Sequence, residues 1–286
     1  MRTPAVSVVI PTCNRPELLV RAIRSVCAQS YQDFEIIVVD DGDASARSLV
    51  DGFHDSRMRY IRHEPPRQGG AAARNTGVNA ARGAFVAFLD DDDEWTPEKL
   101  STQVPLLGNA GPNTVFSFSA VRNVYNDREE VTRVPAGEMN FLERSLTRFS
   151  GFLTSTLLVR RDALLGTGGF DASLPSHQEP DLIIRLSLAH DGVGIPKPLT
   201  IMSMSTEHPH IGSDLSKRIE GRIALLRKHA RLFSTRPRIL ATHYFRIGLW
   251  SRDSGAARQA KKFFFLAFTT SPSPRYLFHC LAMLLR

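Results

Sequence analysis

The chain has 286 residues, of which 42% are hydrophobic and 23% are charged. This is the composition of an ordinary globular protein, and it excludes a fully disordered or fibrous chain. The net charge of +7 conceals a split, because residues 217–286 hold 15 lysines and arginines against 2 acidic residues, whereas residues 1–216 hold 21 against 27. We therefore expect an acidic body and a basic C-terminal region that favours an anionic partner, either nucleic acid, anionic lipid or an acidic substrate.

Cysteine usage and hydropathy indicate the compartment. Cys13, Cys27 and Cys280 fit no zinc-binding spacing and are an odd number, so we expect a reducing compartment rather than a disulfide framework. The apolar stretch near the N-terminus ends at Pro11 and is too short for a signal peptide. No apolar run reaches the roughly 18–20 residues that a membrane span needs. These features predict a cytoplasmic protein, either soluble or bound at a membrane surface.

The first hundred residues alternate between predicted strands and helices. The strands are continuous apolar runs, and the helices show apolar residues at helical spacing. Strands are expected at 6–10, 34–39, 57–62 and 85–89, and helices at 16–28, 44–53, 71–81 and after Thr96, which is expected to cap its helix. This alternation predicts a mostly parallel sheet with helices on both faces and a ligand site at the carboxyl ends of the strands.

The middle of the chain is less regular, and its end is purely helical. Strands are expected at 114–125, 156–159 and 200–204, with helices at 140–149 and 181–189. Further helices are expected at 216–233, 239–252, 256–270 and 274–285, and Ser254-Gly255 turns the second and third of these into a hairpin. We therefore predict an α/β domain over residues 1–215 and a basic helical region over residues 216–286.

Three polar clusters directly follow predicted strands and can converge on one edge of the sheet. The first begins at Pro11 and Thr12 and contains no glycine, which counts against a dinucleotide such as NAD or FAD. The second is Asp40-Asp41-Gly42. We expect Asp41 to contact the base or ribose of a nucleotide, and Asp40 to serve the turn.

The third cluster is the acidic run of residues 90–94, Asp-Asp-Asp-Asp-Glu. Five neighbouring carboxylates cannot all ionise cheaply, so a cation is expected to compensate them. Mg²⁺ or Mn²⁺, held by one or two carboxylates and completed by substrate phosphates, suits this role. The alternative is a solvated acidic turn, which explains poorly why the run directly follows a buried strand.

Three later positions have two interpretations each. Glu179 comes just before the helix expected at 181, where it can act as a general base or cap the helix. His208 can complete a metal site or be structural. Arg74, after Gly69-Gly70, can approach a bound donor, or it can tie the start of a helix to the sheet.

Three segments resemble glycosyltransferase family 2 in order and spacing. They are VSVVIPTCNRPELLVRAIRSVCAQSYQDFEIIVVDDG, GGAAARNTGVNAARGAFVAFLDDDDEW and GGFDASLPSHQEPDLIIRL. The resemblance implies a GT-A fold, which is a Rossmann-like, mostly parallel sheet flanked by helices. It also implies transfer of a sugar, with inversion, from a nucleotide-diphosphate donor. By analogy the product is a bacterial surface polysaccharide or lipopolysaccharide.

The resemblance further implies roles for single residues. Glu179 matches the general base, and Asp92 and His208 match ligands of Mn²⁺ or Mg²⁺. The positions implied at the nucleotide sugar, with a UDP-sugar favoured, are Pro11, Thr12, Arg15, Asp41, Gly69, Arg74, Asp90 and Asp91. Cys13 departs from the family, which often has an aromatic residue there. Glu179-Pro180 also departs, since an aspartate followed by an aromatic residue is usual.

The acceptor and the basic region leave alternatives open. The acceptor is expected to be a glycan or a lipid-linked sugar. The basic helices can bind the anionic inner face of the plasma membrane, or pack against protein. We do not expect nucleic acid as a partner, because the region lacks RNA-binding signatures. A non-catalytic module that binds a nucleotide sugar or glycan is the alternative function.

Overall fold

The computed structural model describes residues 3–149, 151–204 and 214–284. Contacts divide the chain into two compact units. The α/β unit comprises Met1–Ala172 and Glu179–Thr206, and the helical unit comprises Ser173–Gln178 and Glu207–Arg286. The loop Ser173–Gln178 thus belongs by its contacts to the helical unit, although it precedes the helices of that unit in the chain. The division at residue 215 remains a prediction.

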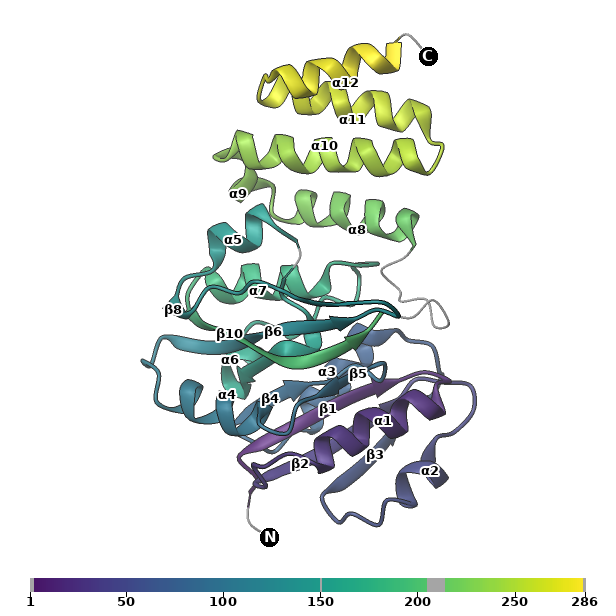
Figure 1. Ribbon diagram of the computed structural model, residues 1–286, viewed down its shortest axis with the longest axis vertical. Coiled ribbons are helices and arrows are strands. Elements are labelled where there is room, and N and C mark those ends of the chain that lie inside the picture. The colour runs from purple at the N-terminus through teal and green to yellow at the C-terminus, as the bar shows by residue number, and fades with distance from the viewer. Residues whose placement is uncertain (1–2, 150, 205–213, 285–286) are drawn as a thin grey trace. The chain divides into compact units, whose positions relative to one another are not determined.

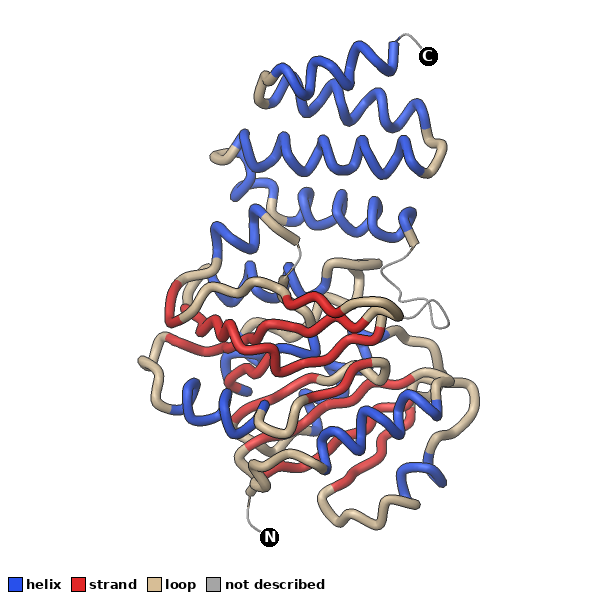
Figure 2. The backbone as a smooth tube through the Cα atoms, viewed as in Figure 1, coloured by secondary structure: helices blue, strands red, loops and turns tan. Residues whose placement is uncertain are grey.

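The described part of the chain contains one ten-stranded sheet (Figures 1 and 2), with strand order β3-β2-β1-β4-β9-β6-β10-β5. Two short strands lie off this path, β7 on β6 and β8 on β10. The strands are β1 Val6–Thr12, β2 Phe34–Asp40, β3 Met58–Arg62, β4 Phe85–Phe88, β5 Asp93–Trp95, β6 Thr114–Val124, β7 Glu129–Val131, β8 Gly137–Met139, β9 Leu157–Arg160 and β10 Asp191–Ser203.

The first four long strands confirm the predicted parallel sheet. β1 pairs with β2 and β4 in parallel, and β2 pairs with β3 in parallel. β9 then enters antiparallel between β4 and β6. The carboxyl ends of β1, β2 and β4 therefore lie at one edge, where the polar clusters were expected to meet.

Helices cover both faces of the sheet. The helical elements of this unit are α1 Pro16–Cys27, α2 Arg47–Asp51, α3 Gly70–Ala80, α4 Lys99–Gly108, α5 Leu142–Thr147, the 3₁₀ turn η1 Thr154–Thr156, α6 Arg161–Gly166 and α7 Gln178–Ser187. Side chains alternate along β1, so that Val8 and Ile10 share a core with α1 and α4. Val9 faces the other core, which contains residues of α3, α6 and α7.

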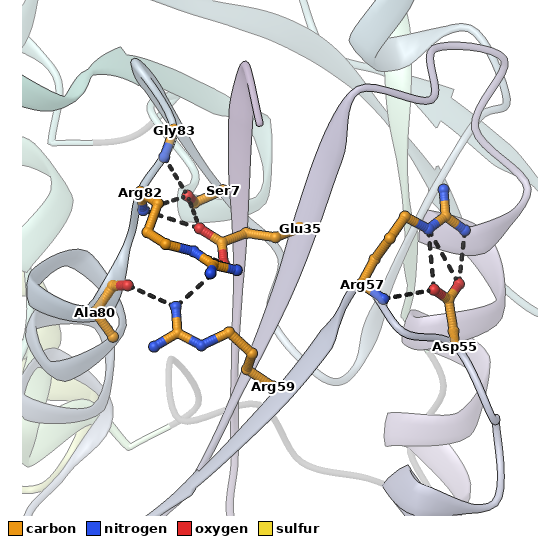
Figure 3. A network of polar contacts seen from close by, with 8 residues as sticks. All are labelled: Ser7, Glu35, Asp55, Arg57, Arg59, Ala80, Arg82 and Gly83. Carbon is orange, nitrogen blue, oxygen red and sulfur yellow. Dashed lines mark hydrogen bonds and ion pairs between the residues drawn. The ribbon is translucent and has the colours of Figure 1, made fainter. Parts of the chain in front are cut away.

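The amino ends of β1 and β2 are joined by a buried polar network (Figure 3). Ser7 Oγ donates to Glu35 Oε1 at 2.8 Å, and Arg82 and Arg59 form ion pairs with Glu35 at 2.7 and 3.1 Å. Burial raises the pKa of Glu35, but the hydrogen bonds from Arg82, Ser7 and Arg59 outweigh burial and hold that pKa below its ordinary value. The polar side chains at the amino ends of β1 and β2 therefore have structural roles.

Two departures from the predicted elements have local causes. β10 begins at Asp191, nine residues before the strand expected at 200, because register shifts around Pro198 absorb the prolines that argued against a strand. α4 begins at Lys99, and no side chain caps it. Thr96 is held to the sheet instead, since its N–H donates to Leu199 O.

The helical unit is a succession of neighbouring helices (Figure 1). They are α8 Leu215–Lys228, α9 Ala230–Ser234, α10 Pro237–Asp253, α11 Ala257–Thr270 and α12 Pro274–Leu284. The chain leaves helical geometry at His229, so the single helix expected at 216–233 is two helices. The predicted hairpin of α10 and α11 is confirmed, with Gly255 at φ +79° in its turn. No helix within the described ranges is long and apolar enough to cross a membrane.

Candidate functional site

The first loop and the acidic run meet at the carboxyl edge of the sheet. Pro11 and Thr12 end β1, and Thr12 Oγ1 donates to Asp91 Oδ2 at 2.8 Å. Arg15, at the start of α1, donates from Nη1 to Asp91 Oδ1 at 3.3 Å and to Asp92 Oδ2 at 3.0 Å. The structure therefore brings together Pro11, Thr12, Arg15, Asp91 and Asp92.

Three arginines, from α1 and α3, compensate much of the acidic run. Arg74 of α3 pairs with Asp90 at 2.6 Å, and Arg15 pairs with Asp91 and Asp92. Glu94 is paired with Arg21 of α1. The sequence predicted a compensating cation but not which arginines face these carboxylates, and the divalent cation stays a prediction.

The carboxyls of this cluster resist ionisation. Burial raises the pKa of Asp91 to about 6, although Thr12 and Arg15 oppose that shift. Burial also raises the pKa of Asp90. Arg74 lowers that pKa, while the charges of Asp92 and Glu179 raise it. The arginines leave part of the negative charge of this cluster unbalanced, and a bound cation would balance it.

Glu179 lies in the first turn of α7, within electrostatic reach of the acidic run. It is the second residue of the helix, whereas the sequence indicated a position just before it. Its Oε1 accepts a hydrogen bond from Thr154 Oγ1 at 2.6 Å. The charges of both Asp90 and Glu179 raise the pKa of Arg74. Arg74 thus connects the acid that follows β4 with the carboxylate that opens α7.

Asn75 takes the structural role that was considered for this helix start. Its side chain donates to Phe170 O and accepts from Phe170 N, both at 2.8 Å, which ties α3 to the segment before α7. Arg74 is buried and faces the acidic cluster. Asn75 therefore has a structural role, whereas Arg74 belongs to the acidic cluster.

The turn η1 contacts both the acidic run and Glu179, and it was not predicted from the sequence. Asp90 N donates to Ser155 Oγ at 3.0 Å, and Ser155 Oγ donates to Asp93 Oδ2. Trp95 Nε1 donates to Ser155 O at 2.8 Å. The available signal was the polar run of residues 154–156, which stands directly before a buried apolar strand.

A buried lysine of α4 donates a hydrogen bond to η1. Lys99 is fully buried, donates from Nζ to Thr156 O at 3.2 Å, and is hydrogen-bonded to Gln103. Burial holds the pKa of Lys99 well below its ordinary value. Gln103 also donates to Thr156 O, at 3.1 Å. The turn that contacts both acid groups is therefore fixed from α4.

Asp41 organises the loop that precedes α3. Its carboxylate accepts from Gln68 N at 2.8 Å and Gly69 N at 2.7 Å, and its Oδ1 is 2.9 Å from His63 Nδ1. Gly69 has φ +96°, a conformation that favours glycine. Neither His63 nor this loop role was apparent from sequence. The nucleotide contact expected for Asp41 stays a prediction.

Asp40 serves the turn after β2. Its Oδ1 accepts from Gly42 N at 2.9 Å, and its Oδ2 accepts from Ala46 N at 2.8 Å at the start of α2. These are the contacts of a turn residue.

The donor set at the acidic run fits a hard divalent cation held by few protein ligands. Asp90 and Asp92 supply carboxylate oxygens, which Mg²⁺ and Mn²⁺ accept together with substrate phosphates. Residues 3–149, 151–204 and 214–284 contain no group of three histidine, cysteine or acidic side chains placed to hold a metal. His208, the third ligand expected from the resemblance, lies outside the described residues.

Comparison with known sequences identifies the family. The model of Glycosyl transferase family 2 matches residues 7–165, more than half of the chain. The amylovoran biosynthesis glycosyltransferase AmsB of Erwinia amylovora is 32% identical over 218 residues, covering 72% of each chain.

Two shorter matches have names that describe lipid-linked sugars. The GalNAc(5)-diNAcBac-PP-undecaprenol beta-1,3-glucosyltransferase of Campylobacter jejuni is 42% identical over 130 residues, which is 44% of this chain and 42% of the relative. The UDP-Glc:alpha-D-GlcNAc-diphosphoundecaprenol beta-1,3-glucosyltransferase WfgD of Escherichia coli is 38% identical over 103 residues, which is 36% of this chain and 40% of the relative.

Solved structures share the fold. TarS 1-349 of S. aureus, in complex with UDP-GlcNAc, has a TM-score of 0.71 at 20% identity, covering 93% of this chain and 81% of the TarS 1-349 chain. The mannosyltransferase PcManGT of Pyrobaculum calidifontis, in complex with GDP-Man and Mn²⁺, has a TM-score of 0.63 at 17% identity, covering 100% and 81%. With this fold and these sequence matches, the chain belongs to glycosyl transferase family 2 and has the GT-A fold.

Proposed function

We propose that this glycosyltransferase moves a sugar from a nucleotide-diphosphate donor to an acceptor hydroxyl, with inversion, during synthesis of a bacterial surface polysaccharide or lipopolysaccharide. The proposal rests on the surroundings of Arg74. Arg74 forms an ion pair with Asp90, and the charge of Glu179 raises its pKa. A carboxylate for proton removal and an acidic cluster for the donor are thereby neighbours.

The donor is proposed to lie along the carboxyl edge of the sheet. Thr12, Arg15 and Asp91 already form one hydrogen-bonded group there. Asp41 and Gly69 border the same edge through the loop before α3. A UDP-sugar is the favoured donor, and TarS, a structural neighbour, is solved with UDP-GlcNAc.

A divalent cation is proposed at Asp92, with Asp90 as its partner. When bound, it would neutralise charge on the diphosphate of the donor. The ion pair of Arg15 with Asp92, at 3.0 Å, holds that carboxylate near the first loop. His208 remains a proposed additional ligand.

Glu179 is proposed to be the general base. It would remove the proton of the acceptor hydroxyl as that oxygen forms its bond to the anomeric carbon of the sugar. The bond from that carbon to the diphosphate breaks on the opposite face, so the configuration inverts. One carboxylate suffices for this displacement, whereas glycoside hydrolysis uses a pair that flanks the bond.

The acceptor is proposed to be a glycan or a lipid-linked sugar, met at the cytoplasmic face of the plasma membrane. Residues 1–215 would perform the transfer and residues 216–286 would attach the enzyme. Phe265 and Phe278 are 61% and 67% exposed, and Lys261 and Lys262 precede the first of them. Exposed aromatic and basic residues suit an anionic lipid surface.

The proposal is tested by a screen of nucleotide sugars for protection against thermal unfolding, in Mn²⁺ and in EDTA. We expect one donor, most simply a UDP-sugar, to raise the melting temperature in Mn²⁺ and to be consumed when acceptor is added. Asp92→Asn should lose the metal-dependent part of the protection, whereas Asp127→Asn, at an exposed position, should keep it.

Two outcomes would count against the proposal. Protection by no nucleotide sugar would contradict the donor class. Protection without transfer to any acceptor or to water would favour a non-catalytic binding module.

A further inference from the structure

Two consecutive carbonyls of the turn η1 are held by side chains from three other elements. Ser155 O and Thr156 O each accept two hydrogen bonds, at 2.8 to 3.2 Å. The donors are Trp95 Nε1 of β5, Thr200 Oγ1 of β10, and Lys99 Nζ and Gln103 Nε2 of α4. A single 3₁₀ turn has few hydrogen bonds of its own, so these contacts fix its position.

The side chains of the same turn hold both parts of the proposed site. Thr154 Oγ1 donates to Glu179 Oε1 at 2.6 Å. Ser155 Oγ accepts from Asp90 N at 3.0 Å and donates to Asp93 Oδ2. The position of η1 therefore sets the separation between the proposed base and the acidic run.

Lys99 is an unusual anchor for a turn, because its side chain is fully buried. Its two acceptors, Thr156 O and Gln103 Oε1, are uncharged, and its Nζ lies 4.8 Å from the centre of the Trp95 ring. Burial holds the pKa of Lys99 well below its ordinary value, because the charged form is disfavoured there. Methionine has a similar length and would fill the space without the cost of burying an amine. What the lysine adds is the hydrogen bond to η1.

Gln103 lies one turn after Lys99 on α4 and completes the anchor. It is fully buried, and its Oε1 accepts from Lys99 Nζ. Its Nε2 donates to Thr156 O and to Ser117 Oγ of β6, both at 3.1 Å. The two side chains therefore connect η1 to α4 and to the sheet.

We propose that Lys99 and Gln103 are positioning residues for the transfer reaction. By holding Thr156 O they fix η1, and η1 in turn holds Glu179 and the acidic run at the separation that the reaction needs. The inference rests on the proposed function, because Glu179 is the base of that reaction. A misplaced base lowers the rate of the chemical step more than it lowers the affinity for the donor.

The first experiment measures hydrogen exchange in the full-length protein without ligand. The amides of Thr156 and Leu157 report on η1, because they donate to Leu153 O and Thr154 O. We expect Lys99→Met to speed exchange of these two amides about tenfold or more. The melting temperature should change little, because the lost hydrogen bonds are offset by the lost cost of burying an amine.

Arg160→Met is the matched control. Arg160 is also a basic side chain that donates to two carbonyls, Thr114 O at 3.0 Å and Leu107 O at 2.9 Å, and these lie outside η1. This variant should melt earlier than wild type and leave the exchange of the two amides of η1 unchanged. If Lys99→Met does not fold, Gln103→Met takes its place and should show the same faster exchange in η1.

The second experiment measures release of UDP from UDP-glucose and from UDP-GlcNAc in Mn²⁺, with water as acceptor. We expect Lys99→Met to lower kcat by about ten- to a hundredfold and to change the KM of the donor little. Lys99→Met/Thr154→Val should be no slower than the slower single variant, because both act on Glu179 through η1. Arg160→Met should keep the wild-type kcat.

Three results would overturn the proposal. Unchanged exchange in η1 would mean that Lys99 does not fix the turn. Faster exchange with the wild-type kcat would mean that the fixed turn is not used in the reaction. Multiplied losses in Lys99→Met/Thr154→Val would mean that Lys99 acts by a route other than Thr154.

The proposed function is checked on the same preparations. If Glu179→Gln releases UDP at the wild-type rate, the proposed base is wrong, and the positioning role is lost with it. If Glu179→Gln is slow and Lys99→Met is not, the proposed function stands and only the positioning role is lost. If wild type consumes neither donor, the choice of a UDP-sugar is contradicted, and hydrogen exchange still decides whether Lys99 fixes η1.

Discussion

Thr154 holds the carboxylate that we propose as the base. Its hydroxyl donates to Glu179 Oε1 at 2.6 Å, and its side chain is 3% exposed. In a buried setting this hydrogen bond orients the carboxylate. Thr154 is therefore a positioning residue.

Replacing Thr154 with valine keeps the shape of the side chain and removes the hydrogen bond. We expect Thr154→Val to lower kcat by about ten- to a hundredfold, which corresponds to loss of one hydrogen bond to a charged group. Thr154→Ser should recover most of the rate, and the KM of the donor should change little in either variant. Steady-state kinetics at saturating donor checks this. An equal fall in the serine variant would assign Thr154 to packing.

Neighbouring aspartates illustrate what sequence can and cannot reveal about single side chains. The position of Asp40 and Asp41 after a buried strand was predictable, and so was the turn role of Asp40. The loop held by Asp41 was not, because its partners at residues 63, 68 and 69 come from a segment without regular structure. Contacts between backbone and side chain across a loop leave no period in the sequence.

Helix α3 lies so close to β1 that the contact needs a glycine. A Cβ at Gly77 would be 2.3 Å from Cγ1 of Val9, a fully buried side chain. This packing positions Arg74, one turn earlier on the same helix, against the acidic run. The helix packing and the site are therefore coupled.

Gly77→Ala should destabilise the protein by about 1–3 kcal/mol through overpacking. Val9→Ala combined with Gly77→Ala should recover part of that loss, because the shortened side chain makes room for the methyl group. Gly108→Ala is the control, since a Cβ there meets no atom within 4 Å. Urea unfolding measures all three. A neutral Gly77→Ala would contradict the close approach.

The network at the amino edge predicts a dependence of stability on pH. Because the folded state lowers the pKa of Glu35 below its ordinary value of 4.5, this group stabilises the fold above that pH. The contribution is lost as the pH falls through the folded pKa. Glu35→Gln should therefore cost stability at pH 7, by about 1–3 kcal/mol, and less at pH 3. Urea unfolding at the two pH values compares variant and wild type, and an equal difference at both would contradict the ion pairs.

The regular α/β part could be predicted because its strands are buried on both faces and its helices are amphipathic. The helix over α1 shows this clearly, with its apolar stripe buried as expected. The full length of strand β10 could not be predicted, since two prolines and two glycines interrupt the strand pattern of its sequence. The turn η1 is three residues long, too short to show periodicity.

The charge split along the chain separates two kinds of chemistry. In the α/β unit the acidic run is partly balanced by Arg15, Arg21 and Arg74, so the surplus negative charge is local. In the helical unit, residues 217–286 hold 15 lysines and arginines against 2 acidic residues. We propose a metal and a nucleotide-diphosphate donor for the first region, and an anionic partner for the second.

We propose that Glu179 removes the proton of the acceptor hydroxyl beside the donor site. The transfer rate of Glu179→Gln tests this role, with donor affinity measured on the same preparation. We predict a fall in rate of at least about a hundredfold, with donor affinity unchanged, because glutamine cannot accept the proton. Transfer at the wild-type rate by Glu179→Gln would exclude Glu179 as the general base.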